Sequence, residues 1–191
     1  MSFFVKTQIV PGKVGGGLQL SDSATSNRIS VEGIDLCDLD GPWTISFWIN
    51  SARDDGALFS QGGGELGTFE AELSDNNLDL CLLTKRQRSV FSCKKKTPLG
   101  EWQHIAVTCD GSGDREGVSI FVDGKEEEIY RAASNNRAHR AADSPEPRFE
   151  FGSTYNPRFG YTAAATIDEV RCYNLQLTPY DIDKIVHYQA R

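Results

Sequence analysis

Residues 101–124 constrain the fold of this chain more than any other stretch. Two sets of side chains alternate along residues 102–109, and this period of two indicates a β-strand. A second alternating run, Val118–Val122, ends in Asp123-Gly124. Asp-Gly between strand-forming residues favours a type I′ turn, because both central residues of that turn need positive φ. We therefore predict a β-hairpin here, with Lys125–Ile129 as the returning strand.

The rest of the chain divides into short runs of strand-forming residues separated by Gly, Asp and Asn. About a dozen such runs, spaced roughly 8–12 residues apart, are typical of an all-β sandwich. A two-sheet antiparallel β-sandwich, or jelly roll, is the natural way to bury one face of each strand. The runs outside the hairpin cover residues 3–9, 18–20, 28–31, 43–50, 57–60, 68–73, 78–83, 89–93, 148–153 and 166–173. Residues 131–146 show no clear strand pattern, so we expect a long loop there.

One short C-terminal helix completes the predicted fold. Thr178 can cap its first turn, Pro179 suits the first helical position, and Asp181 lies in the positively charged first turn. The predicted apolar stripe of the helix consists of Ile182, Ile185 and Val186.

Length and composition indicate a single domain. The chain has 191 residues, of which 39% are hydrophobic and 25% are charged, enough to bury a sizeable core. We predict one domain over residues 1–191, in which residues 1–16 form an edge strand and a glycine-rich link. No apolar run approaches the roughly 20 residues of a membrane-spanning helix, and the N-terminal apolar patch is too short for a signal peptide. We therefore expect either a mature or engineered fragment, or a chain that is not exported by that route.

Four sequence blocks resemble the laminin G-like family, within the concanavalin A-like lectin/glucanase superfamily, which includes pentraxin-like jelly rolls. The central block, from Trp102 to Gly124, is similar to the family pattern W-x-H-I/V-A-x-T…V-x-I-Y-V-D-G. The other blocks are WTISFWI at 43–49, FGS at 151–153 with TIDEVRCYN at 166–174, and LTPYDI at 177–182. The blocks follow the family order over nearly the whole chain, although the opening region lacks the family's Phe and Gly. The resemblance implies the jelly-roll fold.

Charge narrows the choice of partner. The net charge of −7 argues against generic nucleic-acid binding, whose affinity comes largely from neutralised phosphates. Two basic groups, residues 85–88 and Lys94–Lys96, flank the predicted strand at 89–93. They form either a solvated hairpin face or a patch for an anion or a sulfated glycan.

The cysteines do not indicate whether the protein works in an oxidising or a reducing compartment. None of the five forms a close CxxC pair, which makes a zinc or thioredoxin-type site a weak interpretation. Cys81 and Cys93 would face each other if the chain reverses near Gln87. An odd number leaves at least one free thiol in a monomer, and buried free thiols fit the pattern as well as a disulfide does.

The chain lacks the catalytic motif that glucanases of this superfamily use. Retaining glycosidases need two carboxyl groups about 5–5.5 Å apart. Family 16 glucanases place them on one strand as Glu-x-Asp-x-x-Glu, whereas here Thr166 and Arg171 stand at the two catalytic positions. Asp168 and Glu169 are neighbours, which regular strand alternation sends to opposite faces. We therefore predict that the chain is not an enzyme.

Other titratable residues do not change this interpretation. Glu70 and Glu72 share one face of a predicted strand, a pattern more typical of a solvent-facing side. The three histidines show no metal-ligand spacing, and the resemblance implies that His104 is a structural strand residue.

The family resemblance implies binding, because laminin G-like and pentraxin-like relatives often bind calcium, glycans or proteins. Calcium takes about six to eight oxygen ligands. By resemblance, Asp22 and Asp168 are the metal candidates and Ca²⁺ the candidate cofactor. Both residues would serve equally well as turn-capping or solvent-facing side chains.

Residues 155–161 combine aromatic rings with polar donors, which suits sugar recognition because rings stack on apolar sugar faces while amides and guanidinium groups bind hydroxyls. The alternative is that these aromatics lock the loop onto the sandwich. A second, weaker oxygen-rich group comprises Asp54, Asp55, Gln61 and Glu65. The candidate ligand-binding residues are Tyr155, Asn156, Arg158, Phe159, Tyr161 and Gln61.

The favoured hypothesis is a non-catalytic recognition module that binds carbohydrate, with or without calcium, through edge loops. Its partner would be a glycan or glycoprotein. The alternative is a structural or assembly protein, for example a surface or virion decoration subunit, forming a homo-oligomer or a larger assembly. A glycoside hydrolase or lyase is a weaker third hypothesis. We expect an extracellular, virion or cell-surface location, with no nucleic-acid partner and no membrane insertion.

Overall fold

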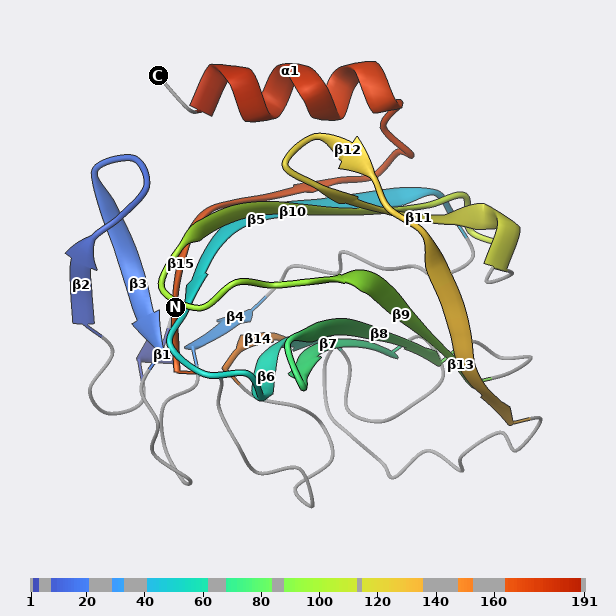
Figure 1. The fold of residues 1–191 in the computed structure, drawn as a ribbon, viewed down its shortest axis with the longest axis horizontal. Coiled ribbons are helices and arrows are strands. Elements are labelled where there is room, and N and C mark those ends of the chain that lie inside the picture. Colours follow the sequence, from blue (N-terminus) through green and yellow to red (C-terminus); the bar gives the residue numbers. More distant parts are fainter. Residues whose placement is uncertain are drawn as a thin grey trace.

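Two antiparallel sheets lie face to face in the computed structural model, and a helix lies across the outer face of one of them (Figure 1). The structure describes residues 2–3, 8–20, 29–32, 41–61, 68–83, 88–112, 115–135, 148–152 and 164–189. The predicted β-sandwich jelly roll with one short C-terminal helix is confirmed. No helix in these residues is long and apolar enough to cross a bilayer.

The strand order defines the two sheets. The eight-stranded sheet runs β1 (Ser2–Phe3), β4 (Ile29–Glu32), β14 (Arg148–Phe151), β6 (Gly56–Gln61), β7 (Thr68–Ser74), β8 (Asn77–Leu83), β9 (Arg88–Lys96) and β13 (Ile129–Asn135). The seven-stranded sheet runs β12 (Lys125–Glu126), β11 (Val118–Val122), β10 (Trp102–Cys109), β5 (Trp43–Ser51), β15 (Ala165–Tyr173), β3 (Gly16–Leu20) and β2 (Gln8–Pro11). The remaining elements are the 3₁₀ turn η1 (Arg115–Gly117) and helix α1 (Pro179–Gln189).

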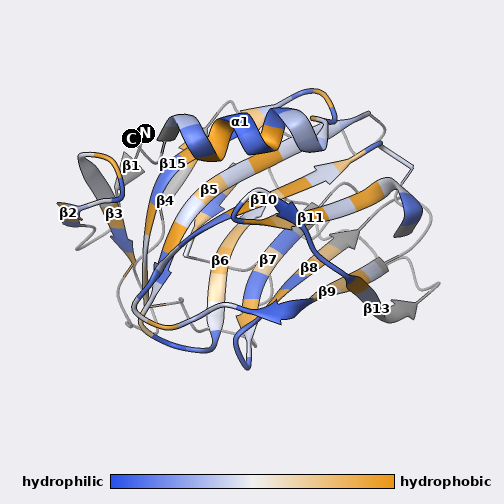
Figure 2. Ribbon diagram, turned by 45° about the horizontal axis from the view of Figure 1, so that its top comes forward, coloured by the Kyte–Doolittle hydropathy of each residue, from blue (hydrophilic) through white to orange (hydrophobic). Residues whose placement is uncertain are grey.

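Aromatic side chains fill the space between the sheets. Strand alternation directs every second side chain inward, and Figure 2 shows hydrophobic and hydrophilic bands alternating along the strands. The ring of Phe47, from β5, meets the ring of Phe59, from β6, edge to face at 5.1 Å. Phe59 in turn stacks on Phe149 at 5.8 Å. Each fully buried Phe contributes roughly 1.5–3 kcal/mol, and the contact between Phe47 and Phe59 joins the two sheets.

The central hairpin forms as predicted, but its returning strand is short. Asp123 and Gly124 have φ values of 51° and 81°, as a type I′ turn requires. β12 ends at Glu126, and the chain then crosses to the other sheet, where Ile129 pairs with Cys93 of β9. The predicted returning strand over Lys125–Ile129 is therefore wrong beyond its first two residues.

The long loop predicted over residues 131–146 is wrong in its first part, because β13 continues as a strand to Asn135. This segment is a strand because it pairs with β9 along the edge of the eight-stranded sheet, a tertiary interaction that leaves no alternating pattern in the sequence.

The glycine-rich stretch near the N-terminus is a hairpin turn rather than a flexible link. β2 and β3 pair antiparallel, and the Gly12 amide donates to the Gly15 carbonyl at 3.0 Å. Gly15 has a φ of 65°. A Cβ added at Gly12 would lie only 2.5 Å from Oδ2 of Asp168, so the turn approaches β15 more closely than a side chain at position 12 would allow.

The predicted facing of Cys81 and Cys93 is not observed. Cys81 lies opposite Val90 in the β8–β9 register, and Cys93 is a buried free thiol. Burial raises the pKa of the Cys93 thiol, and it raises the pKa of the free thiol of Cys172 to about 12. Both thiols therefore behave as small core residues rather than as nucleophiles.

Candidate binding site

Helix α1 is fixed on the sheet by its cap and its apolar face. The Thr178 amide donates to Oδ2 of Asp181 at 3.0 Å, and the Asp181 amide donates to Oγ1 of Thr178 at 3.3 Å. Ile182 is buried against Ala106 and Phe121 on the outer face of the seven-stranded sheet. The predicted cap and apolar stripe are therefore correct. Exposed side chains of the helix lie near β15.

A β-bulge decides which face of the sheet Arg171 occupies. Asp168 lies opposite Trp48, but Arg171 lies opposite Ser46, so β15 has one residue more than β5 in this interval. Glu169, within the bulge, has a φ of 50°. Without the extra residue, alternation would turn Arg171 toward the core, whereas the bulge places it on the outer face, beside α1.

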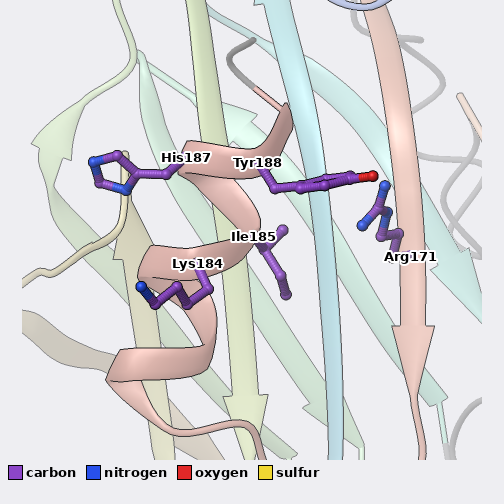
Figure 3. Close-up of a pocket in the computed structure, with 5 residues that line it drawn as sticks. All are labelled: Arg171, Lys184, Ile185, His187 and Tyr188. Carbon is purple, nitrogen blue, oxygen red and sulfur yellow. The ribbon is translucent and has the colours of Figure 1, made fainter.

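A groove of about 420 Å³ lies between α1 and β15. Figure 3 shows the ring of Tyr188 extending from the helix toward Arg171 on the strand, with Ile185 between the helix and the sheet. Lys184 and His187 come from the same helix, and Tyr188 is 78% exposed. The groove thus combines an accessible aromatic ring, an apolar side chain and three basic side chains.

The basic side chains of the groove differ in how they are paired. Nη2 of Arg171 donates to Glu169 at 2.7 Å, and Nδ1 of His187 lies 3.3 Å from Oδ1 of Asp183. Burial lowers the pKa of Arg171, but hydrogen bonds to Glu169 and Tyr173 outweigh it and raise the pKa overall. Lys184 makes no salt bridge within the described residues, although its Nζ lies 5.0 Å from the ring of Tyr180. Arg171 is therefore held in place, while the Lys184 ammonium is available.

Two buried polar residues of the sheet lie near Arg171. Ser46 and His104 are both fully buried on the outer face of β5 and β10. The Oγ of Ser46 and both ring nitrogens of His104 have no hydrogen-bond partner among the described residues. Burial, assisted by the positive charge of Arg171, lowers the pKa of His104 to about 4, so the imidazole is neutral at physiological pH.

Asp168, one of the two predicted metal ligands, anchors the N-terminal hairpin. Its Oδ2 accepts the Val14 amide and its Oδ1 accepts the Glu169 amide, both at 2.8 Å. Nζ of Lys13, from the same hairpin turn, lies 4.4 Å from the ring of Trp48. Both carboxylate oxygens of Asp168 are therefore engaged by backbone amides, and among the described residues no group of three or more His, Cys, Asp or Glu could hold a metal ion.

Gln61, another predicted ligand-binding residue, is not among the residues that line the groove. Gln61 is 1% exposed at the end of β6, where it pairs with Phe149. Asp22, the second predicted metal ligand, lies outside the described residues, as does the predicted aromatic loop with Tyr155, Asn156, Arg158, Phe159 and Tyr161.

The lysines of β9 pair with carboxylates of neighbouring turns and connections. Lys94 pairs with Glu128, Lys95 with Glu127, and Lys96 with Asp75. This favours the solvated-face interpretation of Lys94–Lys96 over an anion patch.

Sequence reasoning missed the groove itself. Tyr180, Lys184 and Tyr188 recur every four residues, which places them along one side of the helix, and this signal was available in the sequence. The outward position of Arg171 had no such signal, because it depends on a bulge that appears only in the pairing of β15 with β5.

The sandwich, with a groove beside its C-terminal helix, belongs to the class of jelly-roll domains that includes lectins and glucanases. A family model described as the concanavalin A-like lectin/glucanases superfamily matches residues 22–183, and the chain therefore belongs to this family. No curated protein sequence matches it.

Several solved structures share the fold at low sequence identity. The binding domain of Paraclostridial Mosquitocidal Protein 1 has a TM-score of 0.68 and 17% identity over 98% of this chain and 47% of that one. The binding domain of botulinum neurotoxin serotype D/C has a TM-score of 0.69 and 13% identity over the same shares. The binding domain of botulinum neurotoxin DC, solved in complex with rat synaptotagmin II, has a TM-score of 0.67 and 12% identity over 98% and 46%. The chain therefore spans about half the length of these binding domains.

Proposed function

We propose that this chain is a non-catalytic recognition module that binds carbohydrate, and that the groove between α1 and β15 is a binding surface. The groove is the observation that carries the proposal, because it presents the exposed ring of Tyr188 beside the guanidinium of Arg171 (Figure 3). Family membership and the fold shared with binding domains support it. The aromatic loop at residues 155–161 remains a second candidate surface.

The described carboxylates support a non-catalytic role. At the position of the second glucanase glutamate stands Arg171, whose guanidinium is bonded to Glu169 on the outer face. Glu70 and Glu72 alternate with the core residues Ala71 and Leu73, so they share the face of β7 that points away from the core. This matches the solvent-side pattern predicted for them.

A glycan array probed with the purified chain tests the proposal, once in millimolar calcium and once in chelator. We expect binding of a defined set of glycans, and we expect Tyr188→Ala to lose most of it. Tyr130→Ala removes a tyrosine on the other sheet that is 43% exposed, and it should leave binding unchanged. Loss of binding in chelator would support the predicted role of calcium, with Asp22 as the candidate ligand to test next. No binding of any glycan in either condition would contradict the proposal.

Protein–protein assembly is the second candidate function, favoured by exposed apolar and aromatic side chains around α1. Leu175, Tyr180 and Tyr188 are 47%, 68% and 78% exposed. If these residues form an interface between copies, sedimentation velocity should show association across micromolar concentrations, and Tyr180→Ala should weaken it.

A further inference from the structure

We infer that the groove between α1 and β15 selects neutral saccharides, and that Glu169 is the positioning residue that orients the Arg171 guanidinium and compensates its charge. The inference rests on the proposed function and names the ligand class of that same site. In this arrangement the ring of Tyr188 packs against the apolar face of a sugar, while N–H groups of Arg171 donate to the sugar hydroxyls.

Glu169 holds the guanidinium of Arg171 and compensates its charge. Nη2 of Arg171 donates to Oε2 of Glu169 at 2.7 Å, and the two side chains are only 35% and 28% exposed. Arg171 also forms a hydrogen bond with Tyr173, so two contacts along the strand restrain the guanidinium. A guanidinium carries five N–H donors in a fixed plane, and these two contacts leave donors for a ligand. Arg171 therefore offers directed hydrogen bonds with little net charge.

The other two basic side chains of the groove do not point toward Arg171. In Figure 3, Lys184 and His187 extend from the helix away from Arg171, whereas the ring of Tyr188 extends toward it. Nζ of Lys184 instead lies 5.0 Å from the ring of Tyr180. The cation that faces Tyr188 is therefore the one with a bonded carboxylate. In a chain whose net charge is −7, this arrangement gives a carboxylate or sulfate group little attraction.

The ring of Tyr188 supplies the apolar half of a sugar site. It is 78% exposed, and Ile185 lies between the helix and the sheet next to it (Figure 3). A pyranose ring presents C–H groups on its faces and hydroxyls around its rim, so one face can lie on an aromatic ring while the rim meets polar groups. A hydroxyl accepts hydrogen bonds without carrying charge, which suits the restrained donors of Arg171. The two sides of the groove thus match the two kinds of surface on a neutral sugar.

Calorimetric titration with a matched pair of oligosaccharides tests the inference. The neutral probe is the neutral oligosaccharide that binds best on the glycan array, and the acidic probe is the same molecule with one primary alcohol oxidised to a carboxylate. Glu169→Gln keeps an oxygen acceptor for Arg171 but removes the charge, whereas Glu169→Ala removes both. Glu128→Gln is the matched control, because it removes a carboxylate that pairs with Lys94 and does not line the groove.

We expect the parent chain to bind the neutral probe at least about threefold more tightly than the acidic probe, with an affinity that changes little as salt rises. In Glu169→Gln the charge of Arg171 is uncompensated, so this preference should fall by at least about threefold. Glu169→Ala also loses the orientation of the guanidinium, and it should bind the neutral probe at least about threefold more weakly than Glu169→Gln does. Glu128→Gln should keep the preference of the parent chain.

Several results would overturn the inference. Equal or tighter binding of the acidic probe by the parent chain, or an array on which only acidic glycans bind, would remove the neutral selectivity and leave the carbohydrate function standing. An unchanged preference in Glu169→Gln, or an equal change in Glu128→Gln, would show that Glu169 does not set it. No binding of either probe, together with a silent array, would remove the proposed function and this inference with it.

Thermal unfolding of each variant separates a binding effect from a loss of folding. Glu169→Gln preserves the size and the hydrogen-bonding capacity of the side chain, so we expect it to fold. If Glu169→Ala does not fold, the comparison of Glu169→Gln with Glu128→Gln decides the matter alone.

Discussion

His104 shows how strongly one buried residue can depend on its surroundings. It lies on β10 with its ring edge-on to Trp48 at 5.3 Å, and both ring nitrogens are buried. The alternating strand pattern around it was readable from the sequence, and the family resemblance implied that it is a structural strand residue. Its neutrality was not, because it follows from burial in the folded chain and from the nearby charge of Arg171.

We expect this residue to make stability depend on pH. The pKa of His104 is lowered from 6.5 to about 4 in the folded chain, so the unfolded chain binds more protons between these values. The free energy of unfolding should therefore fall as pH drops from 6.5 toward 4, by up to about 3 kcal/mol from this group. Urea unfolding at several pH values measures the effect.

Substitution separates His104 from the other titrating groups. His104→Leu should flatten the pH dependence between 4 and 6.5, because it removes the buried imidazole. An unchanged slope in His104→Leu would show that His104 is not the group responsible.

Asp168 is expected to stabilise the fold rather than to hold calcium. Asp168→Ala removes the acceptor of two backbone amides, from Val14 and Glu169, and should cost about 2–4 kcal/mol. Asp54→Ala, at an exposed loop position, should change stability by less than about 0.5 kcal/mol. Thermal unfolding of the parent chain and of Asp168→Ala, each in calcium and in chelator, checks the interpretation. If calcium stabilises the parent chain but not Asp168→Ala, the interpretation is contradicted.

At the scale of the element, the helix was easier to predict than the strand that faces it. The capping residue, the proline and the apolar stripe of α1 are local signals, and each matched the structure. β15 was predicted as a regular strand, but its bulge arises from pairing with β5 and redirects Arg171. The side of the groove that comes from the sheet therefore could not be derived from strand periodicity.

The cap of α1 should contribute measurably to stability. Thr178→Ala removes the hydroxyl that accepts the Asp181 amide, and this should cost about 1 kcal/mol. Thr178→Ser keeps the acceptor and should cost much less. Chemical denaturation of the two variants gives the comparison, and equal losses would show that the hydroxyl does not cap the helix.

At the scale of the whole molecule, local patterns predicted the sandwich because alternation and turn residues repeat along the chain. The crossing of the chain at Ile129 and the strand to Asn135 were missed, since both depend on pairing with β9. The same distinction applies to function. Family membership follows from sequence blocks, whereas the groove depends on a helix and a bulged strand meeting in space.

The most direct test of carbohydrate recognition is to map where a bound sugar contacts the chain. Backbone NMR shifts would be recorded while the best oligosaccharide from the array is added. We predict that the largest shifts occur in β15 around Arg171 and in the second half of α1, and that they shrink in Tyr188→Ala. Shifts confined to the eight-stranded sheet, or no shifts with any glycan, would contradict binding at this groove.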